Sequence, residues 1–145
     1  LGPVKDIAKN MQKSMESLSK KALNSNNNGK INHSIFINAK DALCSINLKL
    51  NNDSNKIIIQ NGSTDINLSG NCSYFYFYNE GFAPLKAFEL EAKKTHIHSN
   101  SISNSEINVT EQLNAEIRNN GNIYYKGTPT IIQTTISGNG RLIPQ

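Results

Sequence analysis

The feature that most constrains this fold is a turn that recurs about every 20 residues through the second half of the chain. Turn-forming triplets begin at positions 61, 81, 101, 119 and 138, so their spacing is nearly constant. Short segments in which apolar and polar residues alternate lie between the turns. A fixed period of this length, with a strand on each side of the turn, is typical of repeat proteins whose coils stack on one another.

The composition agrees with a stacked coil. The chain has 145 residues, enough for one domain with a core, yet only 37% of them are hydrophobic and none is Trp. In a solenoid only every second strand residue faces inward, while the turns and the outer faces stay polar. A modest apolar content combined with a regular period therefore indicates a solenoid rather than a disordered chain.

Residues 1–28 predict a different element, an amphipathic helix followed by an Asn-rich linker. The apolar residues of this segment recur at steps of three or four, which is helical spacing. They are Val4, Ile7, Met11, Met15, Leu18 and Ala22. A basic amphipathic helix can lie on an anionic membrane. We favour a cap instead, because the open end of a stacked β-structure leaves apolar groups and unpaired backbone uncovered.

From residue 29 onward the apolar period becomes two, as in Ile46, Leu48 and Leu50. No second helical pattern follows that could supply βαβ crossovers, so residues 29–145 are expected to form one all-β domain. Two architectures remain, a sandwich of hairpins and a parallel β-helix of about 20 residues per coil. The near-constant spacing favours the parallel β-helix, and Gly and Asn at the corners can take the positive φ that tight corners need.

Six motifs after residue 61 carry a family resemblance. They are Asp65–Asn71, Leu85–Leu90, Glu106–Val109, Leu113–Ile117, Gly121–Pro129 and Ile136–Gly140. Through them the chain resembles the bacterial putative auto-transporter adhesin, head GIN domain family, whose members repeat Gly-Ser-Gly-like turns between short strands. The resemblance implies a right-handed parallel β-helix similar in shape to pectin lyases, export to the cell envelope and a role in adhesion. It brings no catalytic residues to this chain.

The most pronounced alternation in the chain is the run of tyrosines and phenylalanines after the second cysteine. On a strand, Phe75 and Phe77 would face the core, while Tyr74, Tyr76 and Tyr78 would form a ladder on the outer face. Rings about 6.5 to 7 Å apart along a strand can stack on successive sugars of a polysaccharide. The three tyrosines are therefore predicted ligand-binding residues, with coverage by neighbouring coils or a partner subunit as the alternative.

Two residue pairs have a spacing that could suit metal binding or catalysis. His96 and His98 share a face at a spacing suited to one metal ion, but His33 is three repeats away and no Cys or carboxylate is obviously aligned with them. Glu89 and Glu91 also share a face, yet nearby lysines favour a solvated, charge-balanced surface over the acid and base of a glycosidase. We expect no catalytic residues, no metal site and no cofactor.

Charge, hydropathy and cysteine content limit which partners and which cellular locations are expected. Of the net charge of +4, residues 1–23 carry +3, so the β-domain lacks the basic face of a nucleic-acid binder. No apolar run approaches the roughly 18 to 20 residues of a membrane span. We expect a signal peptide to have been removed before Leu1. Cys44 and Cys72 permit one disulfide, although two unpaired core residues are favoured.

Together these patterns predict an extracellular, surface-bound or periplasmic adhesion and recognition scaffold that binds a glycan or a surface protein without catalysis. A carbohydrate-active enzyme of pectin-lyase-like fold and a purely structural component of the cell envelope are the alternatives. Homo-oligomer formation stays open.

Overall fold

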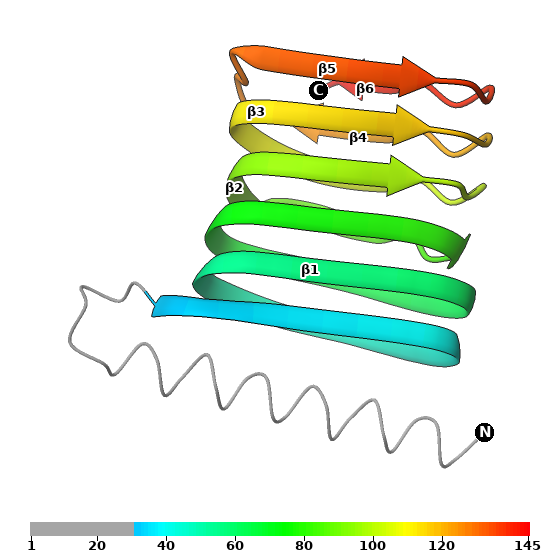
Figure 1. Ribbon diagram of the computed structural model, residues 1–145, viewed down its shortest axis with the longest axis horizontal. Helices are drawn as coiled ribbons and strands as arrows, with labels where there is room; N and C mark the ends of the chain where they lie inside the picture. The colour runs from blue at the N-terminus through cyan, green and yellow to red at the C-terminus, as the bar shows by residue number, and fades with distance from the viewer. Residues whose placement is uncertain (1–30) are drawn as a thin grey trace.

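The structure is a computed structural model that describes residues 31–145, and every regular element among them is a β-strand (Figure 1). The strands are β1 (Ile31–Phe82), β2 (Leu85–Ser99), β3 (Ser105–Ile117), β4 (Ile123–Lys126), β5 (Ile131–Ile136) and β6 (Leu142–Pro144). The predicted helix and linker of residues 1–28 lie outside the described residues.

All strand pairs between different elements are parallel, and the chain winds so that each coil lies beside the previous one. Following one ladder, Ile66 is opposite Leu85, and that ladder continues through Ser105 and Ile123 to Leu142. The positions along this ladder are spaced almost as evenly as the turns in the sequence. The predicted parallel solenoid and its period are therefore confirmed.

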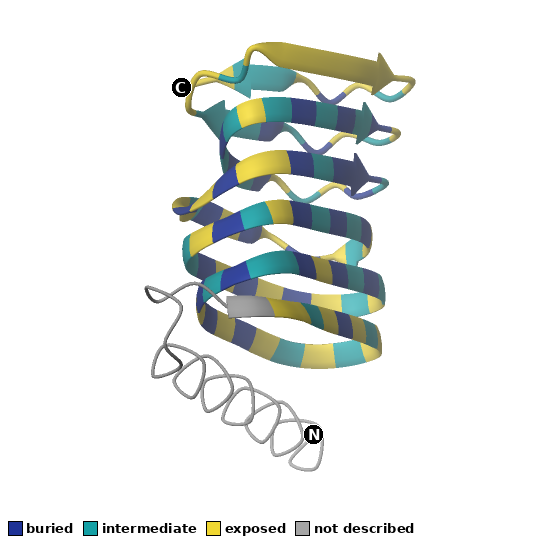
Figure 2. Cartoon of the chain, turned by 60° about the vertical axis from the view of Figure 1, so that its left-hand side comes forward, coloured by how far each residue is buried: buried dark blue, intermediate teal, exposed yellow. Residues whose placement is uncertain are grey.

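The coils are flattened, so that the strands form two layers (Figure 1). The front sheet contains β5 and the ends of β2 and β3, whereas the back sheet contains β4, β6 and the beginnings of β2 and β3. The long β1 contributes the earlier coils. The core lies between the two sheets, which is why buried and exposed residues alternate along the ribbon in Figure 2.

Apolar ladders fill this core. In the front sheet, Phe75 and Phe77 are 1% and 0% exposed, and their ring centroids lie 6.1 Å apart. On the next coil Ile97 lies beside Phe77, and it is also fully buried. In the back sheet Ile66 and Leu85 pair in the same manner. Each coil thus covers the apolar residues of the coil before it, and the burial stabilises the stack by about 25 cal/mol per Å².

Side chains at the corners satisfy backbone groups that leave the strand ladders. Asn79 Nδ2 donates a hydrogen bond to the carbonyl oxygen of Ala83 at 2.9 Å. One coil later, Ser101 Oγ donates to the carbonyl oxygen of Gly81 at 2.5 Å. Because an unpaired buried carbonyl is costly, these bonds explain why Asn and Ser recur at the corners.

The two cysteines are unpaired, as the sequence favoured. Cys44 Sγ lies 3.7 Å from the hydroxyl of Thr64 on the next coil. Cys72 is 7% exposed, and its burial raises the pKa of the thiol to about 11, although a hydrogen bond with Asn55 acts in the opposite direction. Both residues fill space in the coil and neither cross-links it.

Gly70 marks a corner that tolerates no side chain. Its φ is +106°, and a methyl group there would overlap the carbonyl oxygen of Leu50 on the preceding coil. We predict that Gly70→Ala lowers the free energy of unfolding by about 2 kcal/mol or more, measured by urea unfolding followed by circular dichroism. Ser63→Ala, at an exposed position of the same strand, is the control and should change it by less than about 0.5 kcal/mol. Equal stability of the two variants would contradict the prediction.

Candidate functional site

The three predicted tyrosines lie on the outer surface of the front sheet. Tyr74 is 38% exposed, and Tyr76 and Tyr78 are half-buried, while the phenylalanines between them face the core. The predicted orientation of this strand is therefore confirmed. Ligand binding by the tyrosines stays a prediction.

The next coil extends the aromatic ladder with histidines. His96 lies opposite Tyr76, and the two ring centroids are 5.3 Å apart with an angle of 64° between the ring planes. His98 lies opposite Tyr78, at 4.6 Å and 31°. One further coil adds Glu116 opposite His98. These side chains form the Tyr–His face, which we define as Tyr74, Tyr76, Tyr78, His96, His98 and Glu116.

The preceding coil also covers part of the ladder. Lys56 Nζ lies 5.0 Å from the ring centroid of Tyr76 and 5.8 Å from that of Phe36, which places the ammonium between two aromatic rings. Tyr76 is therefore contacted from both neighbouring coils. By contrast, no ring or cation contact within residues 31–145 involves Tyr74. Of the three tyrosines, Tyr74 offers the ring that is freest for stacking.

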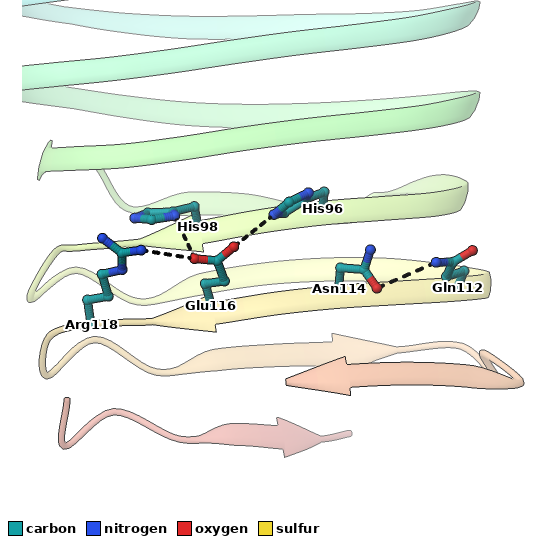
Figure 3. A network of polar contacts seen from close by, with 6 residues as sticks. All are labelled: His96, His98, Gln112, Asn114, Glu116 and Arg118. Carbon is teal, nitrogen blue, oxygen red and sulfur yellow. Dashed lines mark hydrogen bonds and ion pairs between the residues drawn. The ribbon is translucent and has the colours of Figure 1, made fainter. Parts of the chain in front are cut away.

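The carboxylate of Glu116 joins both histidines (Figure 3). Glu116 Oε1 lies 3.4 Å from His96 Nε2, and Glu116 Oε2 lies 3.2 Å from His98 Nδ1. The guanidinium of Arg118 adds a third contact, at 3.4 Å from Oε2. A carboxylate only accepts hydrogen bonds, so the ring nitrogen that faces it must carry a hydrogen. In each neutral imidazole the other nitrogen is then an acceptor.

The network shifts the pKa values of Glu116 and His98. Partial burial raises the pKa of Glu116, but the hydrogen bond from His96 and the positive charges of the histidines and Arg118 outweigh it, so the net pKa lies below the ordinary value of 4.5. For His98, burial lowers the pKa below the ordinary value of 6.5, and the nearby carboxylate only partly offsets this. At neutral pH the arrangement is an ionised carboxylate beside a neutral His98.

Glu116 is the residue that sequence reasoning missed. The sequence indicated no carboxylate aligned with His96 and His98, whereas the structure places one between them. The repeat period could have identified Glu116, because His98 and Glu116 are separated by as many residues as the turns at 101 and 119. Within residues 31–145, no group of three or more His, Cys, Asp or Glu side chains has the arrangement of a metal site. The contacts of Glu116 are those of a hydrogen-bonding partner.

The two other candidate carboxylates do not converge on one site. The side chain of Glu89 is 82% exposed and lies 4.0 Å from Lys126 Nζ. Glu89 lies within a bulge of β2 and lines one surface hollow, whereas Glu91 follows the bulge and lines another. A glycosidase needs both carboxylates beside one bond, and the separate hollows do not place Glu89 and Glu91 in that way.

Comparisons with known proteins agree with the fold. The family model described as "Putative auto-transporter adhesin, head GIN domain" matches residues 14–129. Among solved structures, a putative adhesin from Bacteroides fragilis is similar, with a TM-score of 0.69 and 21% sequence identity. The similarity covers 80% of this chain and 55% of that one, so the chain spans about half the length of that protein. At this identity the likeness shows the fold alone. No curated protein matches the chain.

The lowered pKa of His98 makes stability depend on pH. The unfolded chain binds a proton at this residue near pH 6.5, whereas the folded chain resists doing so until the pH is lower. The contribution of His98 is therefore present above pH 6.5 and is lost as the pH falls through the pKa of the folded state. We predict that the melting temperature decreases between pH 7 and pH 5, and that His98→Gln makes this decrease smaller.

Differential scanning fluorimetry at constant ionic strength measures how the melting temperature changes with pH in the unmodified chain and in the His98→Gln variant. Glu116 also has a lowered pKa, but its contribution is lost only below about pH 4.5, so it does not confound the window. An unchanged slope in the His98→Gln protein would show that this imidazole does not set the pH dependence.

Proposed function

The chain belongs to the putative auto-transporter adhesin, head GIN domain family, and from that premise we propose that it is an extracellular adhesion and recognition scaffold. In this proposal its coils wind right-handed, as in the family, and it binds a glycan or a surface protein, without catalysis, at the cell surface or in the periplasm. Among residues 31–145 the structure contains no helix of the length and apolarity that spanning a membrane requires.

The observation that carries the proposal is the Tyr–His face. It joins aromatic rings, imidazoles and a carboxylate on consecutive strands of one sheet, and all its residues except the buried His98 are exposed or half-buried. Aromatic side chains with a polar end are favoured where proteins bind partners, because they supply contact area and hydrogen bonds together. The parallel ladder holds these groups in fixed register, so little ordering is required on binding.

For a glycan, each group has a distinct role. The ring of Tyr74 stacks on the apolar face of a sugar. Burial raises the pKa of Tyr74 and of Tyr78, so both phenols stay protonated at neutral pH. The Tyr74 hydroxyl can donate to a sugar, whereas Tyr78 gives its single hydrogen to Glu80 at 3.2 Å and offers its oxygen as an acceptor. The acceptors for sugar hydroxyls are the Glu116 carboxylate and the free imidazole nitrogens.

A structural role in the cell envelope is the second candidate, and it rests on β5. All six residues of this strand are exposed, and Ile131, Ile132 and Ile136 have 49%, 44% and 48% of their surface in water. β5 pairs only with β3 among the described strands, so its other edge presents unpaired backbone groups. Such an edge can pair with another chain, which makes self-association the form that this role would take.

If the β5 edge mediates self-association, replacing Ile131 and Ile136 with Lys should keep the protein monomeric, because edge lysines oppose strand pairing. Sedimentation velocity over a hundredfold concentration range measures the oligomeric state of the variant and of the unmodified chain. The control is Ile102→Lys, which changes an isoleucine that is 59% exposed at a corner away from β5. A monomer at every concentration for the unmodified chain would exclude this candidate.

The recognition role predicts that replacing Tyr74, Tyr76 and Tyr78 with Ala abolishes binding to glycans or target surfaces. The loss should be at least about tenfold in affinity, because each aromatic contact contributes about 0.5 to 1.5 kcal/mol. Binding to a glycan array is measured beside circular dichroism, which must show an unchanged β-signal. Tyr74→Phe should retain binding if the ring stacks.

The matched control is the double variant Gln133→Ala and Thr135→Ala. Gln133 and Thr135 continue the ladders of Tyr76 and Tyr78 three coils later and are exposed, so the variant removes polar side chains from the same sheet without touching the rings. Unchanged binding by the triple tyrosine variant, or equal loss in the control, would reject the Tyr–His face as the binding surface.

A further inference from the structure

The back sheet carries a second surface of different chemistry. A hollow of about 550 Å³ crosses β1, β2 and β3 on the face away from the core. The residues that matter to its chemistry are Asn47, Lys49, Asn67, Lys86, Phe88 and Glu106. Its floor includes Leu48 and Leu68, whose side chains are buried in the core.

A bulge in β2 forms one wall of the hollow. On the β1 side, Asn67 pairs with Lys86 but Ser69 pairs with Glu89, so β2 has one residue more than β1 over this stretch. The extra residue lifts this part of β2 out of the flat sheet and places Phe88 beside the hollow.

The bulge is larger on the β3 side. There the paired positions of β2 jump from Ala87 to Glu91 while those of β3 advance by one residue. The segment 88–90 therefore has no strand partner on β3. A hydrogen bond of 3.1 Å from Asn108 Nδ2 to the carbonyl oxygen of Phe88 replaces one missing ladder contact. The bulge is thus held in place and keeps Phe88 at the rim.

The polar groups of the hollow are unsatisfied within the described chain. Among residues 31–145, no hydrogen bond or ion pair is made by the side chains of Lys49, Lys86 or Glu106, although Lys86 and Glu106 are register partners. The same holds for the two asparagine amides that line the hollow. Glu89 is different, because its carboxylate lies 4.0 Å from Lys126. Lys126 also lies 4.9 Å from the ring centroid of Phe88. With Glu89 and Lys126 included, the hollow and its rim carry three ammonium groups and two carboxylates, a net charge of +1.

We propose that this hollow binds an acidic saccharide, a sugar chain that contains hexuronate units. The net positive charge of Lys49, Lys86 and Glu106 favours a carboxylated ligand, and the two ammonium groups are its direct partners. The amides of Asn47 and Asn67 donate to and accept from sugar hydroxyls. The ring of Phe88 packs against the apolar face of a sugar on the side that Lys126 does not cover.

The dimensions fit more than one sugar unit. The site spans four successive coils, with Asn47, Asn67, Lys86 and Glu106 one on each. Neighbouring strands are about 4.8 Å apart, so the site extends about 14 Å along the stack. This site is independent of the Tyr–His face, because it lies on the other sheet and shares no residue with it. Either surface can bind without the other.

The test is a ¹H–¹⁵N NMR titration of the whole chain with trigalacturonate at pH 7 and low salt, beside a neutral galactose trisaccharide. We expect trigalacturonate to shift the amide signals of residues 47–49, 67–69 and 86–89, and to bind at least about tenfold more tightly than the neutral sugar. Affinity should fall at higher salt, because exposed charges are screened. Equal binding of both sugars, no shifts, or shifts confined to other residues would overturn the proposal.

Three single variants test whether trigalacturonate binds in the hollow. Lys49→Gln and Lys86→Gln should each weaken binding several-fold, and Phe88→Ala about tenfold. The two lysine side chains are exposed, so these variants keep the core intact and preserve the test even if Phe88→Ala fails to fold. Lys94→Gln, an exposed lysine opposite Tyr74 on the front sheet, is the matched control and should bind normally.

The triple tyrosine variant separates the two proposals. It should bind trigalacturonate as the unmodified chain does, whatever its effect on the Tyr–His face. Unchanged affinity in both lysine variants would overturn the hollow as the site.

Discussion

The structure depends on the in-register stacking of parallel coils. Each backbone ladder places a residue beside its counterpart one coil earlier, and the coils are of nearly equal length. Successive coils approach so closely that some corners have no room for a Cβ atom. At Gly70 and Gly127, both with positive φ, a side chain would meet a carbonyl oxygen of the preceding coil. Glycine at these corners is a condition for the stack to close.

The same stacking creates the two proposed binding surfaces, because it brings together residues that are one period apart in the sequence. Tyr76 and His96 become ring neighbours in this way, and Glu116 meets two histidines that belong to the previous coil. On the back sheet the regular ladder is interrupted by the bulge in β2, and a hollow forms there. Regular stacking thus produces a flat aromatic face, and a local irregularity produces a concave polar one.

A stiff scaffold of this kind suits adhesion. The proposed binding groups are carried by strands whose positions are fixed by backbone hydrogen bonds, so association would lose little conformational entropy. Membership of the head GIN domain family supports such a role. Two surfaces on opposite sheets would also allow one molecule to contact two sites, and weak contacts that act together can give a strong attachment.

Much of the architecture could be read from the chain alone. The turn spacing predicted the coil and its period, and the alternation after Cys72 predicted which aromatic residues face the core, because side-chain direction on a strand follows a period of two. These properties are local or strictly periodic, so the sequence by itself determines them. The register between neighbouring coils is different. The coils differ slightly in length, so paired residues shift relative to one another at places that no local sequence pattern reveals. The bulge at Phe88 and the hollow beside it depend on those offsets, whereas Lys56 and Glu116 lie one regular coil from the rings that they contact. The bulge and the hollow arise only when the coils are assembled, because they are set by how one coil meets the next.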